Sequence, residues 1–151
     1  MKFCAAIDLG ASSGRVSIGS LDGMNLQIQE VHRFKHEAQV NSDGALRWEW
    51  DTIVEEVIRG LRKAQEFGEI VSIGIDTWAV DYGLLDSNGN LIEQPYCYRD
   101  SRTDGLMKSI SDSLGAEWIY QRTGIQFIFF NKNRGFISYT IVIFRYGFVA
   151  G

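Results

Sequence analysis

Apolar and polar positions alternate along the first fifty residues, which is the pattern of strands that bury one face. The apolar run 3–7 and the segment 16–19 flank a glycine- and serine-rich connection. Two further segments, 26–31 and 46–50, alternate apolar and polar residues, and an Asp-Gly pair precedes each of them. Because Asp-Gly is typical of tight hairpin turns, these four segments are predicted to be strands of an antiparallel meander.

The hydrophobic period changes after Asp51. Apolar residues then recur every three or four positions as far as Gly68, which predicts an amphipathic helix with Asp51 as its N-cap and Gly68 as its stop. The apolar run 70–75 that follows is predicted to be a buried strand ending at Asp76. Strands, a helix and a further strand together indicate a mixed α/β domain.

The second half of the chain carries weaker signals. Residues 87–90 contain Asn-Gly between two short apolar segments and predict a hairpin. Residues 100–114 indicate an exposed helix with Asp100 as its cap, and residues 116–121 indicate another helical turn. The nearby Arg99 could pair locally or contact an anionic or polyhydroxyl ligand.

The composition changes abruptly near residue 131. Residues 1–131 hold 12 basic and 19 acidic residues, whereas residues 132–151 hold three basic residues and no acidic one. The apolar run 136–150 includes Arg145 and is shorter than the roughly 20 residues that cross a bilayer, so no membrane contact is expected. We therefore expect a domain of residues 1–131 followed by an apolar tail of residues 132–151.

The whole chain has a globular composition and a modest negative charge. Its 151 residues are 45% hydrophobic and 23% charged, with a net charge of -4, which excludes a disordered chain and argues against a nucleic-acid partner. Two cysteines are too few for a disulfide scaffold, and no secretory signal opens the sequence, so a cytoplasmic protein is expected. Cys4 lies in an apolar strand and is interpreted as a small core residue.

Residues 8–15 form the first candidate site, a loop between two strands. Two glycines that permit positive φ, two hydroxyl donors and one fixed guanidinium suggest phosphate binding; these are Gly10, Gly14, Ser12, Ser13 and Arg15. Asp8 could hold a hydrated Mg²⁺, which prefers oxygen ligands. The loop lacks the Gly-Lys-Ser/Thr of a Walker motif, and an ordinary turn is an equally good interpretation.

Residues 76–81 form the second candidate site. Asp76 ends a strand as Asp8 does, and two carboxylates at neighbouring strand ends are costly without a cation or donors. Trp78 could stack on a sugar, although large aromatic residues more often pack in a core. His32 and His36 have a four-residue spacing that suits metal binding on a helix, but the first lies in a strand-like segment, so a surface role is expected for both.

Four motifs, in order and with matching spacing, resemble the rhamnulokinase branch of the FGGY carbohydrate kinase family. The motifs are residues 8–16, 74–81, 98–103 and 120–127, and the resemblance runs from residue 3 to about residue 131. Four spaced motifs are more specific than any single loop. The Trp and the following Asp of the second motif distinguish it from the glycerol kinase and xylulose kinase branches.

The resemblance implies a fold, a reaction and site residues. The implied fold is the N-terminal part of a ribonuclease H-like, actin-type ATPase domain, and the implied reaction transfers phosphate from ATP to L-rhamnulose with Mg²⁺. By resemblance, Asp8 is the Mg²⁺-associated acid, and the ATP-phosphate loop comprises Ala11, Ser12, Ser13, Gly14 and Arg15. Ala79 matches a substrate-contacting position that is more usually Gly, and it is flanked by Thr77, Trp78 and Asp81.

The resemblance also ends within the chain. The family's catalytic base and adenine-binding elements lie beyond residue 151, so no catalytic base is assigned and the chain alone is expected to be inactive. Residues 128–131 keep two of the family's four residues Leu-Pro-Phe-Asn. We hypothesise that residues from about 132 onward derive from a shifted reading frame.

Two other functions stay open. A ribonuclease H-like nuclease could use Asp8 and Asp76 as two-metal ligands, although the acidic balance and the lack of further carboxylates count against it. A non-catalytic remnant could instead associate with itself through the uncharged segment 136–144, which has high β propensity.

Overall fold

The computed structural model describes residues 1–78 and 81–124. The chain divides into two compact units, Met1–Trp78 and Ala79–Gly151.

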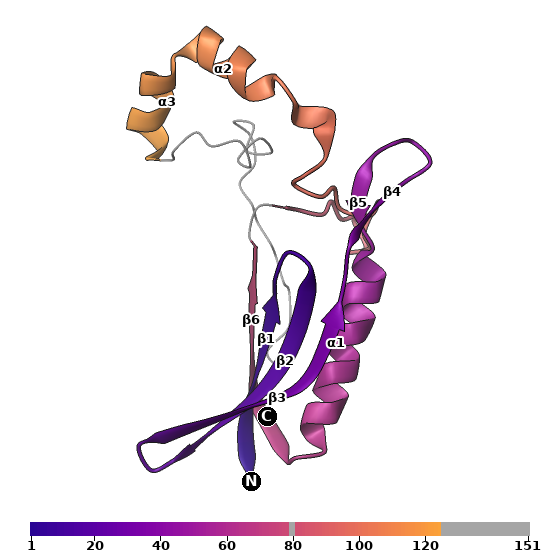
Figure 1. Cartoon of the computed structure of the whole chain (residues 1–151), viewed down its shortest axis with the longest axis vertical. Helices are drawn as coiled ribbons and strands as arrows, with labels where there is room; N and C mark the ends of the chain where they lie inside the picture. The colour runs from indigo at the N-terminus through magenta and orange to yellow at the C-terminus, as the bar shows by residue number, and fades with distance from the viewer. Residues whose placement is uncertain (79–80, 125–151) are drawn as a thin grey trace. The chain divides into compact units, whose positions relative to one another are not determined.

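The first unit is built on a four-stranded mixed sheet (Figure 1). Its strands are β1 (Lys2–Leu9), β2 (Ser13–Asp22), β3 (Asn25–Lys35) and β6 (Glu69–Thr77), in the order β3-β2-β1-β6. The first three pair in antiparallel fashion, whereas β6 is parallel to β1. The predicted mixed α/β class and the meander of the first three strands are confirmed.

The fourth predicted strand does not join this sheet. β5 (Leu46–Trp48) instead pairs with β4 (Ala38–Val40) in a separate two-stranded sheet.

The tip of the β2–β3 hairpin extends away from the main sheet (Figure 1), and its apolar side chains are exposed, with Met24 98% exposed.

Helix α1 (Trp50–Gln65) packs on one face of the sheet, mainly against β2 and β3. The helix is confirmed, but the predicted cap is wrong, because Asp51 lies inside the first turn. The N-cap position is Glu49, which makes no side-chain capping hydrogen bond. The helix ends at Gln65, before the predicted stop at Gly68.

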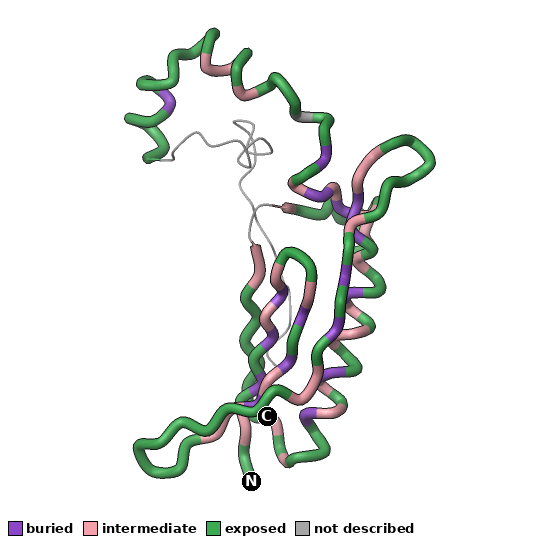
Figure 2. The backbone as a smooth tube through the Cα atoms, in the orientation of Figure 1, coloured by how far each residue is buried: buried purple, intermediate pink, exposed green. Residues whose placement is uncertain are grey.

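The core lies between α1 and alternate residues of β1 and β2, as the alternation of buried and exposed positions along the strands shows (Figure 2). Its members are Ala5, Ile7, Leu9, Val16, Ile18, Ile53 and Ala64. Cys4 is exposed, so the prediction of a core cysteine is wrong. Strand alternation explains this, because the neighbouring Ala5 points to the helix-covered face.

Strand β6 forms where predicted but is not buried. The side chains of Val71, Ile73 and Ile75 are 50%, 55% and 43% exposed. Among the described residues β6 is one of the two edge strands of the main sheet, and α1 packs mainly against β2 and β3 instead. An apolar run of this kind is equally consistent with a central strand, and the sequence pattern does not separate the two.

In its described part, residues 81–124, the second unit has no helix before Ser101 and is largely helical from there on. The predicted hairpin is reduced to one bridge between Leu85 and Leu91. The predicted helix 100–114 is divided into a 3-10 turn (Ser101–Thr103) and α2 (Leu106–Leu114), because Gly105 has a φ of 80°. The further helical turn is confirmed as α3 (Ala116–Thr123).

Two predictions fall partly or wholly outside the described residues. The apolar tail 132–151 and the motif end at 125–127 are not described, so the division of the chain at residue 131 stays a prediction. Within residues 1–78 and 81–124, no helix has the length and apolar character needed to cross a membrane.

Candidate active site

The turn between β1 and β2 carries the predicted phosphate loop. The Gly10 N–H donates to the Ser13 carbonyl at 2.9 Å, and the His36 N–H donates to the Ser12 carbonyl at 3.2 Å. The loop is therefore a strand-to-strand turn, as predicted, and its backbone is fixed from both sides. Ala11 and Ser12 are exposed at its tip.

Gly14 of this loop has a packing role that the sequence did not predict. Neither Gly10 nor Gly14 has a positive φ, so the loop does not use the left-handed backbone that these glycines permit. Gly14 is paired with Phe34 on β3, and a Cβ at Gly14 would lie 2.2 Å from Phe34 Cζ. The missing side chain of Gly14 thus makes room for a buried aromatic ring.

Four charged residues stand side by side across the main sheet. The strand register pairs Asp76 with Asp8, Asp8 with Arg15, and Arg15 with Arg33. Because paired residues point to the same face of a sheet, these four side chains form one row on the face away from α1; we call it the cross-strand row. The structure therefore brings together the two strand-end carboxylates that the sequence singled out.

The carboxylates of the row differ in their partners. The Arg15 Nε–H donates to Asp8 Oδ2 at 2.8 Å, with both side chains about half exposed. Asp76 is exposed and makes no side-chain hydrogen bond or ion pair among the described residues. Oxygen donors with this placement suit a hydrated divalent cation such as Mg²⁺.

Glu30 and Arg33 extend the charged network on β3. The Arg33 Nε–H donates to Glu30 Oε1 at 2.9 Å. This hydrogen bond is the main cause that lowers the pKa of Glu30, and the charge of Arg15 adds to it. The same hydrogen bond raises the pKa of Arg33, to which the charge of Asp8 contributes. The charges of β1, β2 and β3 therefore act on one another.

The predicted sugar motif spans the boundary between the two units, and part of it lies outside the described residues. Thr77 ends β6, and Trp78 is half-buried, with its ring centroid 4.8 Å from Trp48 and 5.6 Å from His36. These contacts favour the core interpretation for at least part of the indole. Ala79 lies outside the described residues, and Asp81 belongs to the second unit.

His36 is buried and His32 is largely covered, so the surface role predicted for both is wrong. His36 is 6% exposed, and its ring contacts Trp48 at a centroid distance of 5.4 Å. The His32 side chain is 9% exposed, and its Nε2 lies 2.7 Å from Glu56 Oε2. Lys63 Nζ lies 3.0 Å from His32 Nδ1. The network of His32, Glu56 and Lys63 joins β3 to α1. No motif in the sequence predicts these contacts.

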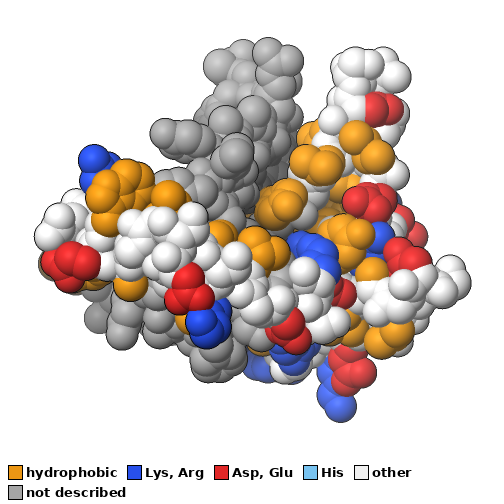
Figure 3. Space-filling view, turned by 90° about the horizontal axis from the view of Figure 1, so that it is seen from above, with side chains coloured by type: hydrophobic (Ala, Val, Ile, Leu, Met, Phe, Trp, Pro, Cys, Tyr) orange, Lys and Arg blue, Asp and Glu red, His pale blue; other side chains and the backbone are white. Residues whose placement is uncertain are grey.

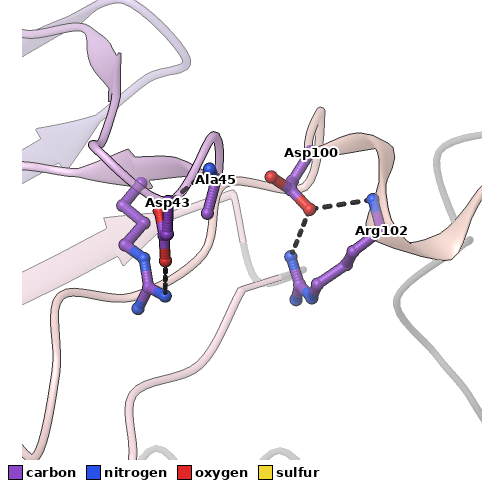
Figure 4. Close-up of polar contacts among 5 residues, drawn as sticks. Asp43, Ala45, Asp100 and Arg102 are labelled. Carbon is purple, nitrogen blue, oxygen red and sulfur yellow. Dashed lines mark hydrogen bonds and ion pairs between the residues drawn. The ribbon is translucent and has the colours of Figure 1, made fainter.

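Asp100 is a structural cap, as predicted. Its Oδ1 accepts the Arg102 backbone N–H at 2.9 Å and the Arg102 Nη1–H at 3.3 Å (Figure 4). The Arg102 guanidinium also lies 3.7 Å from the centre of the Tyr96 ring. For Arg99, a hydrogen bond to Cys97 is the main cause that raises its pKa. These contacts give Asp100 and Arg102 a structural role in the third motif, and the two alternatives for Arg99 stay open.

A similar local contact organises the turn between β4 and β5. Asp43 accepts the backbone N–H of Ala45 at 3.0 Å through Oδ1 and the Nη2–H of Arg47 at 2.9 Å through Oδ2 (Figure 4). The Ala45 hydrogen bond is the largest cause that lowers the pKa of Asp43.

Within the part of the chain that the structure describes, no group of three or more metal-binding side chains gathers.

Comparison with known proteins identifies the family. Residues 3–133 match the family model described as the N-terminal domain of the FGGY family of carbohydrate kinases. The chain is 48% identical to a rhamnulokinase of Mannheimia succiniciproducens over 130 residues, which is 84% of this chain and 27% of that protein. It is 45% identical to a rhamnulokinase of Ligilactobacillus salivarius over 134 residues, 87% of this chain and 27% of that protein.

Solved structures agree on the fold. A ligand-bound xylulose kinase from Lactobacillus acidophilus matches with a TM-score of 0.66 at 14% identity, covering 80% of this chain and 24% of that one. A Plasmodium falciparum glycerol kinase with ADP matches with a TM-score of 0.64 at 15% identity, covering 86% of this chain and 27% of that one. The predicted actin-type ATPase fold, in its N-terminal part, is thereby confirmed.

The matched region is a well-defined part of a longer protein type. The chain spans about a quarter of the length of the rhamnulokinases that it matches. The family match nevertheless covers most of the chain, and it includes both strand-end aspartates and the turn between β1 and β2. The chain therefore belongs to the FGGY family of carbohydrate kinases.

Proposed function

We propose that this chain supplies the phosphate loop and part of the sugar site of a cytoplasmic, ATP-dependent kinase that converts L-rhamnulose to L-rhamnulose 1-phosphate. The observation that supports this most directly is the cross-strand row, in which Asp8 and Asp76 stand in register beside the turn that carries Ala11 and Ser12. Identities of 45–48% to rhamnulokinases support the choice of sugar.

Mg²⁺ and the nucleotide phosphates would be held by different parts of this site. Asp8, with Asp76 beside it, would bind the hydrated cation, which neutralises charge on the phosphates when it is bound. The backbone amides of residues 11–14, the hydroxyls of Ser12 and Ser13 and the Arg15 guanidinium would donate hydrogen bonds to the phosphate oxygens. The turn is already fixed by two backbone hydrogen bonds, so little conformational entropy is lost on binding.

The sugar would be bound by the motif of residues 77–81. In this proposal Ala79 supplies the contact to the ketose, and Thr77, Trp78 and Asp81 each contribute to sugar binding, as the resemblance of this motif to rhamnulokinases implies. Trp78 is held from one side by Trp48 and His36, which would fix the orientation of the indole against a sugar ring.

The phosphoryl transfer itself needs a base, and no residue of the described ranges 1–78 and 81–124 is assigned that role in this proposal. In-line transfer depends on positioning and on neutralising the phosphate charge, and the residues above address only those two requirements. We therefore expect the chain alone to bind ATP weakly and to turn over L-rhamnulose at a negligible rate.

The test is a pair of measurements on the purified chain. Isothermal titration with ATP and MgCl₂ should detect binding, and Asp8→Asn should weaken it. A coupled assay with ATP, MgCl₂ and L-rhamnulose should show no turnover above a protein-free control. Turnover at ordinary enzymatic rates would disprove the proposal that the chain lacks a catalytic base. The absence of any ATP binding would disprove the proposal that the turn between β1 and β2 binds the nucleotide phosphates.

A nuclease of the ribonuclease H type is the second candidate, because Asp8 and Asp76 are in register. The described residues bring no third carboxylate or histidine to this pair. Among the described residues that Figure 3 shows in colour, acidic and basic side chains are interspersed and form no broad basic patch for a nucleic acid. Magnesium-dependent cleavage of an RNA–DNA hybrid, lost in Asp76→Asn, would favour the nuclease over the kinase.

A further inference from the structure

The ion pair between Arg15 and Asp8 engages both residues that the proposed function needs for ligands. The Arg15 Nε and the Asp8 Oδ2 are 2.8 Å apart, and the two side chains are 48% and 46% exposed. In the proposed function, Asp8 would bind the cation and Arg15 would bind the phosphates. Any ligand that binds either side chain therefore has to replace or share this contact.

We propose that Arg15 is a placeholder cation for Asp8, so that polyphosphate binding and divalent-cation binding are coupled through exchange of this ion pair. The inference rests on the proposed function and adds a regulatory step to the same site. When phosphate oxygens accept the N–H groups of Arg15, the guanidinium leaves Asp8. The freed carboxylate then stands beside Asp76 as a stronger cation site.

The neighbours of the pair in the cross-strand row explain why the exchange would matter. Asp76 is opposite Asp8 on the next strand, and like charges in this position repel each other. Arg15 offsets part of that repulsion while it is paired with Asp8. Arg33, the next residue of the row, is engaged by Glu30 at 2.9 Å, so it does not replace Arg15.

The coupling has a definite sign. Arg15 competes with a cation for Asp8 when no polyphosphate is present, and it assists the cation once a polyphosphate has drawn it away. By thermodynamic linkage, the cation must raise polyphosphate affinity by the same factor, because it prevents the ion pair from re-forming. Removal of Arg15 should therefore change the two affinities in opposite directions.

The experiment compares Arg15→Gln with Arg33→Gln in the full chain. Each change removes one positive charge from the same face, but only the first breaks the contact to Asp8. Binding of MgCl₂ alone, and of ATP in EDTA, is followed by the backbone amide shifts of residues 8–15 and 76 in ¹⁵N spectra. Matching far-UV circular dichroism spectra verify that both variants are folded.

We expect Arg15→Gln to bind Mg²⁺ roughly two- to fivefold more tightly, which is the range for releasing an exposed ion pair. The same variant should bind ATP about tenfold more weakly, because charge-assisted hydrogen bonds to phosphate are lost. Arg33→Gln should change neither affinity by more than about twofold, because Arg33 is paired with Glu30 instead.

Asp8→Asn provides the reverse test, because it frees Arg15 and removes a cation ligand. It should bind metal-free ATP more tightly and Mg²⁺ more weakly. Unchanged or weaker Mg²⁺ binding in Arg15→Gln, with ATP binding intact in the unmodified chain, would overturn the coupling alone. Failure of the unmodified chain to bind ATP under any condition would instead overturn the proposed function.

Discussion

Helix α1 packs tightly against the sheet at Gly60, and replacing this residue with alanine tests that contact. A Cβ at this buried position would lie 2.5 Å from Val16 Cγ2 and 2.9 Å from Val16 Cβ. Alanine favours a helix over glycine by about 1 kcal/mol, whereas overpacking a dense interior costs about 1–3 kcal/mol. Both distances are below normal contact, and the Val16 Cβ cannot move by a rotamer change.

We therefore place the packing cost near the upper end of its range and expect Gly60→Ala to lower the free energy of unfolding by about 1–2 kcal/mol. Urea titration followed by far-UV circular dichroism measures this change. Gln65→Ala, at an exposed position of the same helix, is the control and should change it by less than about 0.5 kcal/mol.

A double-mutant cycle with Val16→Ala isolates the contact. The Val16 side chain is fully buried, so Val16→Ala alone is destabilising, but it also makes room for the new methyl group. The double variant should be less destabilised than the sum of the single variants by about 1 kcal/mol or more. If Gly60→Ala stabilises the chain by the full helix-propensity gain, the close approach of α1 to β2 is refuted.

Three further predictions concern the same unit and the tail. His32→Ala should lower the free energy of unfolding by about 2 kcal/mol, because it removes a buried ring and its contacts to α1; Arg33→Ala, at an exposed position, should change it by less than about 1 kcal/mol. The pKa of Glu30 is lowered in the fold, mainly by Arg33. The ionised carboxylate therefore stabilises the fold at pH values above its unfolded pKa, and this stabilisation is lost as the pH falls through the folded pKa. Between pH 6 and pH 3, the urea midpoint of Glu30→Gln should therefore decrease less than that of the unmodified chain. Association through the apolar tail, the alternative raised by the sequence, predicts that deleting residues 132–151 lowers the apparent mass in size-exclusion chromatography, and identical elution of both chains would contradict it.

The carboxylate pair could be predicted because it depends only on where strands end. Asp8 and Asp76 each follow an apolar run, and strands that lie parallel and adjacent bring their carboxyl ends to one edge. The register then pairs the two residues directly. A motif that needs only strand ends and strand direction is thus accessible to sequence reasoning.

The surroundings of the histidines could not be predicted in the same way. His32, Phe34 and His36 alternate along one stretch of chain, and alternation shows which residues share a face without showing which face is covered. The covered face is the one on which α1 packs, and Gly60 of α1 lies close to Val16 and His32 on that face. The same ambiguity produced the wrong prediction for Cys4, which lies on the opposite face from Ala5.

The two faces of the main sheet carry different kinds of stabilisation, and this separates folding from the proposed binding. The face toward α1 is held by buried apolar side chains such as Ile7 and Val16, whose truncation costs several kcal/mol. The cross-strand row on the other face contains half-exposed pairs such as Arg15 and Asp8, which are worth about 0–1 kcal/mol each. Substitutions in the row should therefore alter ligand affinity in a chain that still folds. A substitution in the row that unfolded the chain would mean that this face contributes to the core after all.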